Sequence, residues 1–207
     1  MSQRIGLYGG SFDPIHFGHL ISARSIAEQL GLARIVLIPS ARPPHKRGVV
    51  LSDARHRLAM VKLAVAGDPL FEVSDVELHR AGPSYTIDTV ADFRTRLGPE
   101  VELIWIIGAD SLPELPTWHR IAELVTQVRI VTATRPGWKP PALEALAAVV
   151  GAVRAQALFD DCVSTPAIDI SSTQIRERAA KKRSIRYLTP DEVTSYISKN
   201  GLYASLR

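Results

Sequence analysis

The chain has 207 residues, of which 46% are hydrophobic and 22% are charged. These proportions are typical of a globular protein with a sizeable core, and they argue against a disordered chain. The net charge of +4 is a mild excess that suits a polyanionic ligand such as a nucleotide or a nucleic acid.

The sequence contains no pattern typical of a secretory signal or a membrane span. The longest apolar run, near residues 103–107, is far too short to cross a bilayer. Cys162 is the only cysteine, so an internal disulfide is excluded, which agrees with a reducing compartment. We therefore expect a cytoplasmic protein without membrane partners.

The beginning of the chain predicts two parallel strands joined by a helix. Arg4 to Tyr8 and Arg34 to Pro39 are short apolar runs, and Leu20 to Leu30 has apolar residues at helical spacing. Gly31 suits the C-terminal end of that helix. A strand, a helix and a strand within about 35 residues form a βαβ unit with a right-handed crossover.

The rest of the chain continues the alternation after a Pro-rich, basic loop at residues 41–50. The further elements expected, in chain order, are a helix from Ser52 to Ala66, a strand from Phe71 to Leu78, a helix that starts at Ser84 or Thr86 and ends at Leu97, strands at 101–107 and 127–132, a helix at 142–150, a strand within Ala155 to Val163, and closing helices at 175–180 and 191–199.

This order predicts a single α/β domain over residues 1–207. We expect a Rossmann-like, doubly wound, mainly parallel sheet with helices on both faces and a small helical C-terminal part from about residue 171. Ligands of such sheets bind beyond the carboxyl ends of the strands. The segments after Tyr8, Pro39, Ile107 and Ala133 should therefore surround one crevice.

The stretch GGSFDPIHFGH, residues 9–19, directly follows the first strand and indicates a phosphate site. Gly9 and Gly10 lack a Cβ, which lets the backbone turn sharply and lets a ligand approach main-chain N–H groups. The next helix should begin near Gly18, so its positive end faces the same place. His16 and His19 can donate hydrogen bonds to phosphate oxygens. Without further context, these histidines would also suit ordinary core or surface positions. A zinc site is disfavoured because the sequence offers no second pair of ligands.

The same stretch resembles the HxGH signature of the nucleotidyltransferase superfamily, whose members activate small molecules with ATP or CTP. ISSTQIR, residues 170–176, resembles the second signature of that superfamily, ISSTxxR. Further segments are similar to the bacterial nicotinate-nucleotide adenylyltransferase family, so that the resemblance covers nearly the whole chain: SYTIDTV (84–90), IGADSLPELPTWH (107–119), RPGW (135–138) and SIRYLTPDEVTSYISKNGLY (184–203).

The resemblance implies adenylyl transfer from ATP to nicotinate mononucleotide, which gives deamido-NAD and pyrophosphate in NAD biosynthesis. The 5′-phosphate of the acceptor attacks the α-phosphorus of ATP directly, so catalysis needs alignment and charge stabilisation and no side-chain nucleophile. The resemblance gives this task to His16 and His19. It also implies Mg²⁺ held mainly by phosphate oxygens, with no metal site built by the protein.

The residues that the resemblance implies for ATP binding follow two strands and open one helix. Besides His19 they are Gly9, Gly10, Ser11, Gly108, Asp110, Ser171, Ser172, Thr173 and Arg176. Without the resemblance, the two serines and the threonine would also suit an ordinary helix N-cap, and Asp110 would suit a helix cap.

The residues implied for binding nicotinate mononucleotide are His45, Lys46, Thr86, Trp118, His119 and Arg135. His45 and Lys46 would contact phosphate, and Trp118 would stack on the pyridine ring. Main-chain N–H groups of Thr86 and His119 would hold the nicotinate carboxylate, and Arg135 would add an anion contact. Without the resemblance, the loop pair would be solvated and Trp118 would belong to the core.

Two other functions stay open from the sequence. Within the superfamily, the acceptor could be nicotinamide mononucleotide or another phosphorylated compound. In a different class, a non-catalytic nucleotide- or RNA-binding protein would use the basic cluster Lys181, Lys182, Arg183 and Arg186, although such runs are usually solvated surface. We expect no nucleic-acid partner, and the sequence leaves a homo-oligomer open.

Overall fold

The computed structural model describes residues 3–44, 48, 50–135, 137–139 and 141–204. Six strands of this part of the chain form one sheet in the order β3-β2-β1-β4-β5-β6, and each neighbouring pair is parallel. The strands are β1 (Arg4–Gly10), β2 (Arg34–Pro39), β3 (Phe71–Val73), β4 (Glu102–Gly108), β5 (Arg129–Thr134) and β6 (Cys162–Ser164). The Rossmann-like, doubly wound fold expected from the alternation of elements is confirmed.

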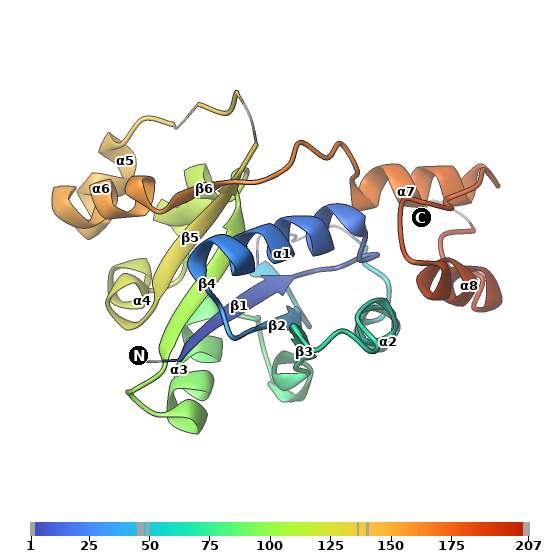
Figure 1. Cartoon of the computed structure of the whole chain (residues 1–207), viewed down its shortest axis with the longest axis horizontal. Helices are drawn as coiled ribbons and strands as arrows, with labels where there is room; N and C mark the ends of the chain where they lie inside the picture. The colour runs from blue at the N-terminus through green and yellow to red at the C-terminus, as the bar shows by residue number, and fades with distance from the viewer. Residues whose placement is uncertain (1–2, 45–47, 49, 136, 140, 205–207) are drawn as a thin grey trace.

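Helices cover both faces of this sheet (Figure 1). The α-helices are α1 (Phe17–Leu30), α2 (Ala54–Ala64), α3 (Thr86–Leu97), α4 (Ile121–Gln127), α5 (Glu144–Val150), α6 (Ala152–Asp160), α7 (Ser172–Ala180) and α8 (Asp191–Lys199), and the short 3₁₀ helices are η2 (Val76–His79) and η3 (Leu112–Thr117). None of the described helices is long and apolar enough to span a bilayer.

The strands supply two cores because successive side chains point to opposite faces of the sheet. In β4, Leu103, Trp105 and Ile107 pack with α3 to α6, whereas Ile104 and Ile106 pack on the other face with α1, α2, α7 and α8. A strand buried on both faces reads as a continuous apolar run, which explains why the sequence identifies β4 so readily.

Two predicted strands are largely wrong. Of the strand predicted from Phe71 to Leu78, only Phe71–Val73 pairs with β2, and this pairing ends at Leu37. The chain then forms η2, which buries Val76. Residues 152–160 form α6, where Ala155 and Leu158 are buried at helical spacing, so the strand begins only at Cys162. A short apolar run fits both the period of a strand and the period of a helix, so the segments that pack beside it decide which of the two it forms.

The closing helices lie at one end of the molecule, far from α5 and α6 (Figure 1). Here α8 packs on α2, and Ile175 of α7 joins the core that contains α1. Because the motif at residues 9–19 leads from β1 into α1, this packing brings the C-terminal part of the chain to that motif.

Candidate active site

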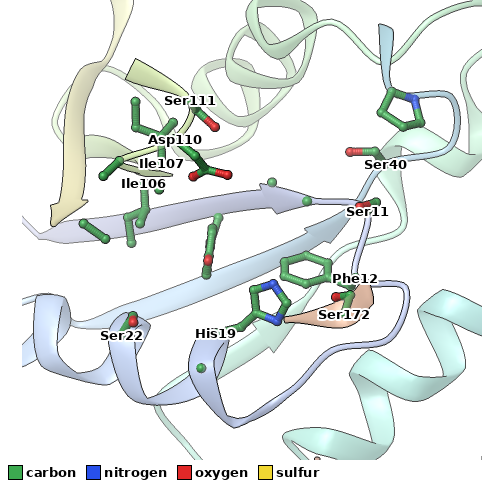
Figure 2. A pocket seen from close by; sticks show the side chains of 18 of the residues that line it. Ser11, Phe12, His19, Ser22, Ser40, Ile106, Ile107, Asp110, Ser111 and Ser172 are labelled. Atoms are coloured by element: carbon green, nitrogen blue, oxygen red, sulfur yellow. The ribbon is translucent and has the colours of Figure 1, made fainter. Parts of the chain in front are cut away.

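A cavity of about 990 Å³ opens beyond the carboxyl ends of β1, β2, β4 and β5. The chain reverses its direction of winding between β1 and β4, which is the switch point where ligands of such sheets bind. Figure 2 shows Asp110 on one side of this cavity and His19 with Ser172 on the other. The crevice expected from the sequence therefore exists, and both signatures contribute to its wall.

Gly9 and Gly10 line the cavity. The structure requires glycine at these positions for a different reason from the one expected. Both continue β1, and neither has a positive φ. A Cβ on Gly9 would lie 2.6 Å from Cζ2 of Trp105, and one on Gly10 would lie 3.0 Å from Cζ of Phe12. The glycines are therefore needed for space, while the turn comes at Phe12, whose φ is 45°.

His16 and His19 lie at the start of α1, and both line the cavity. The backbone N–H of His16 donates to Nδ1 of His19 over 3.2 Å. The two rings stack with centroids 3.7 Å apart. A Cβ on Gly18 would lie 3.0 Å from Nδ1 and Cε1 of His16, so the glycine between the histidines leaves room for the His16 ring.

The environment of His16 favours the neutral imidazole. The residue is only 6% exposed. Burial, and then the positive charge of Arg135, lower the pKa of His16 to about 4. At neutral pH the free protein therefore presents an uncharged ring, which can still donate one N–H to an anion.

The second signature lies against the first. Ser171 caps α7 by accepting a hydrogen bond from the Gln174 N–H, at 3.1 Å. Arg176 Nη1 donates to the Asp13 carbonyl over 2.8 Å, and Ser172 Oγ donates to the Pro14 carbonyl over 2.8 Å. The expected ATP-binding residues Ser171, Ser172, Thr173 and Arg176 all line the cavity, together with Gly9, Gly10, Ser11 and His19.

Three further bonds hold the N-terminal motif, and sequence reasoning missed all of them. Thr189 Oγ1 donates to the Ile15 carbonyl over 2.7 Å, and the Tyr203 hydroxyl donates to Oδ1 of Asp13 over 2.7 Å. The Phe17 N–H donates to the Leu188 carbonyl over 3.1 Å. The family-like ending at residues 184–203 was the available signal, but its contact with residues 13–17 required the fold.

The end of β4 supplies Gly108 and Asp110 to the cavity. Asp110 does not cap η3, whose N-cap is Ser111. A Cβ on Gly108 would lie 2.5 Å from Oδ1 of Asp110, so the carboxylate folds back over the glycine. Burial and the charge of Asp110 raise the pKa of Tyr8, a cavity residue that sequence reasoning did not single out.

The residues expected to bind the second substrate also line this cavity: Thr86, Trp118, His119 and Arg135. The His119 ring stacks on Tyr85 with centroids 4.2 Å apart. Trp118 ends η3 and packs partly against the core of that face. His45 and Lys46 lie outside the described residues.

The cavity can bind an elongated polyanion. It is surrounded by the N-terminal ends of α1 and α7, by two imidazoles and by the guanidinium groups of Arg135 and Arg176. The helix ends and the imidazoles attract phosphate without a full positive charge. Among the residues that the structure describes, no group of three His, Cys, Asp or Glu side chains could hold a metal ion.

Comparison with known proteins agrees with this geometry. The model of the cytidylyltransferase-like family matches residues 7–178. Probable nicotinate-nucleotide adenylyltransferases of Moorella thermoacetica and Thermomicrobium roseum are both 42% identical to the chain; the first comparison covers 97% of this chain and 91% of the relative, and the second covers 99% and 93%.

Solved structures of nicotinic acid mononucleotide adenylyltransferase from Plasmodium falciparum have the same fold. The complex with NaAD superposes with a TM-score of 0.76 at 20% identity, and the complex with APC superposes with a TM-score of 0.73 at 19% identity. Each match covers 98% of both chains.

Proposed function

The chain belongs to the nicotinate-nucleotide adenylyltransferase family, and on this premise we propose how its own residues carry out the reaction. The protein transfers the adenylyl group of ATP to nicotinate mononucleotide, which gives deamido-NAD and pyrophosphate in a step of NAD biosynthesis. The single observation that carries the assignment of residues is that His19 and Arg176, one from each signature, line one cavity.

The triphosphate of ATP lies, in this proposal, between the starts of α1 and α7. His16 and His19 donate to phosphate oxygens from one side, and Arg176 supplies a full positive charge from the other. Backbone N–H groups and hydroxyls at the two helix starts complete the cradle. The residues involved besides these three are Gly9, Gly10, Ser11, Ser171, Ser172 and Thr173.

The transfer is a direct displacement at phosphorus. An oxygen of the acceptor 5′-phosphate forms a bond to the α-phosphorus of ATP, while the bond from that phosphorus to the bridging oxygen breaks and pyrophosphate leaves. The attacking phosphate is already anionic, so no side chain must remove a proton. His16 and His19 are the catalytic residues because preorganised donors stabilise the charge that spreads over the phosphoryl oxygens.

The nucleoside parts bind on either side of the phosphates. Gly108 and Asp110 hold the sugar and base of ATP where β4 ends. Thr86, Trp118 and His119 line what we call the acceptor end of the cavity, where the Trp118 ring stacks on the pyridine and main-chain N–H groups of Thr86 and His119 hold the carboxylate. Neutral donors aimed at an anion favour nicotinate over nicotinamide.

The phosphate of the acceptor needs further cations. Arg135 lines the cavity close enough to His16 to lower the pKa of that ring. His45 and Lys46 are the other proposed phosphate contacts, and they belong to the basic loop at residues 41–50. A charge from that loop would complete the neutralisation of the two substrates' phosphates.

Mg²⁺ is the metal we propose for the reaction. It binds readily through phosphate oxygens and water, so the lack of a three-residue metal cluster among the described residues is compatible with it. When bound with ATP, it neutralises charge on the phosphates. The protein residues then have only to orient the metal-bound nucleotide and to exclude water.

The cytoplasm is the proposed place of action, because the lone Cys162 is half-buried and unpaired by any disulfide, which suits a reducing compartment. ATP and nicotinate mononucleotide are the proposed partners, and no nucleic acid is among them.

An acceptor screen tests the proposed specificity. Pyrophosphate release would be measured with ATP, Mg²⁺ and, in turn, nicotinate mononucleotide, nicotinamide mononucleotide and other phosphorylated acceptors. We expect the highest kcat/KM with nicotinate mononucleotide, and equal use of nicotinamide mononucleotide would refute the preference.

His19→Ala, which removes one charge-directed donor, should lower kcat by about 10²- to 10³-fold while the variant stays folded.

A further inference from the structure

Arg57 is a buried cation that the mechanism above does not use. It lies in the first half of α2, is 1% exposed, and does not itself line the cavity. A buried guanidinium is costly unless hydrogen bonds satisfy its donors. The partners of these donors therefore show what the residue does in the fold.

The Arg57 guanidinium binds three backbone carbonyls from three different segments. Nη1 donates to the Ser11 carbonyl over 2.7 Å, and Nε donates to the Ser52 carbonyl over 2.9 Å. Nη2 makes a longer bond of 3.4 Å to the Ala41 carbonyl. Ser11 belongs to the motif at residues 9–19, whereas Ala41 and Ser52 lie at the two ends of the basic loop at residues 41–50. One side chain therefore connects both ends of the loop with the motif.

The end of the loop at Ser52 depends on buried side chains. The Ser52 N–H donates to Oδ2 of Asp13 over 3.2 Å, so that Asp13 and Arg57 bind both backbone polar groups of this residue. Each of these two side chains belongs to a residue that is only 1% exposed. The other end also has a backbone bond, from the Ser84 N–H to the Arg42 carbonyl over 3.0 Å. Loss of the guanidinium should therefore release the end at Ser52 first.

The loop between these two ends reaches the cavity. Pro43 and Pro44 line it, and the next residues in the sequence are His45 and Lys46, the proposed contacts of the acceptor phosphate. A loop whose ends are held together has fewer conformations to lose when it binds a ligand. Arg57 can therefore strengthen the binding of the acceptor without touching it.

We propose that Arg57 is a positioning residue for the acceptor: it joins both ends of the loop at residues 41–50 to Ser11, and so keeps the basic residues of the loop within reach of the acceptor phosphate. The inference rests on the proposed function. The ATP side should be less affected, because the bonds from Ser172, Arg176 and Thr189 to residues 13–15 do not involve this guanidinium.

The test separates positioning of the acceptor from general stability. Steady-state kinetics of Arg57→Lys would be measured through pyrophosphate release, with each substrate varied in turn. Lysine keeps the positive charge, but its donors share one nitrogen and cannot bind three carbonyls around a planar fork. We expect KM for nicotinate mononucleotide to rise about tenfold, the typical worth of a hydrogen bond to a charged group. KM for ATP and kcat should stay within about threefold of the wild type.

Asp13→Ala is the second variant, because it releases the same end of the loop from the other side. The substitution removes the acceptor of the Ser52 N–H, and it also removes the bond from the Tyr203 hydroxyl. Its KM for nicotinate mononucleotide should rise more than its KM for ATP. Arg55→Ala is the matched control: this exposed residue lies on the same helix and does not line the cavity, so both KM values should stay near those of the wild type.

Equal changes in both KM values, an unchanged acceptor KM in folded Arg57→Lys, or the same shift in Arg55→Ala would each overturn the inference. If Arg57→Lys does not fold, Asp13→Ala decides by the same criterion. Failure of both variants to fold would show that the two residues stabilise the whole fold, and this too would overturn the inference.

The wild type distinguishes the inference from the function on which it rests. A wild-type protein without turnover on nicotinate mononucleotide would overturn the proposed function, and the inference with it. An active wild type together with an unshifted Arg57→Lys variant would overturn the inference alone.

Discussion

Arg176 Nη1 lies 2.8 Å from the backbone carbonyl of Asp13, although 163 positions separate the two residues in the sequence. The same guanidinium holds Thr173 Oγ1 through Nη2 over 3.1 Å. One side chain therefore connects the start of α7 with the loop that leads to His16. In the proposed complex, this connection places the positive charge of Arg176 beside the triphosphate before ATP arrives.

Replacement of this guanidinium should affect catalysis far more than folding. We expect Arg176→Ala to lower kcat/KM by about 10²- to 10³-fold, because both the charge and the link to the Asp13 carbonyl are lost. Arg176→Lys should recover only part of the rate, since an ammonium group cannot make both bonds in the same fork geometry. Steady-state assays of pyrophosphate release would measure this.

Arg178→Ala is the matched control on the same helix. Its guanidinium donates to the Ser184 carbonyl, and Arg178 does not line the cavity. Its kcat/KM should stay within about threefold of the wild type, as expected for a partly exposed residue away from the reaction. If both arginine variants lost activity equally, the special role of Arg176 would be refuted.

The buried imidazole of His16 should make the protein less stable in mild acid. The pKa of His16 falls from 6.5 to about 4 in the folded protein. Between these values the unfolded chain binds the proton and the folded protein does not, so the free energy of unfolding decreases as the pH falls from 6.5 towards 4. The lost stability amounts to about 3 kcal/mol, at 1.36 kcal/mol for each pKa unit.

Urea unfolding at pH 7 and at pH 4.5 would measure this contribution. His16→Gln removes the titrating group, so the variant should lose less stability than the wild type between the two pH values. Because other groups titrate in the same range, the comparison concerns the difference between the two proteins. Identical losses would contradict a lowered pKa for His16.

Replacement by alanine should lower mainly the catalytic rate at Gly18 and only the stability at Gly31. A Cβ on Gly18 would lie 3.0 Å from the His16 ring and 3.4 Å from the Ile170 carbonyl. Gly18→Ala should therefore displace the ring and lower kcat by about tenfold, while alanine's higher helix propensity offsets part of the cost in stability.

Gly31 ends α1 with a φ of 61°, and nothing lies within 4 Å of the place where its Cβ would be. Gly31→Ala should cost about 1 kcal/mol of stability through backbone strain and leave kcat unchanged. Thermal unfolding and initial rates of both variants give the comparison. A Gly18→Ala enzyme with the rate of the wild type would show that the position of the His16 ring does not matter.

The sequence alone identified the elements whose periodicity is strong and local. The first βαβ unit and β4 were predicted within a few residues, because long apolar runs and helical spacing depend on neighbours in the chain. The residues implied for the site also lie together as expected, apart from His45 and Lys46, which lie outside the described residues. Their individual roles stay predictions, and so does the single domain over residues 1–207.

Only the tertiary structure decided how distant segments complete the site. That Thr189 and Tyr203 hold residues 13–15 depends on contacts between residues far apart in the chain. The short run at 71–78 became a strand only where β2 offered a partner. Local pattern determines which residues can be buried or can bind phosphate, whereas the packing of α7 and α8 against the rest of the fold determines which of them meet.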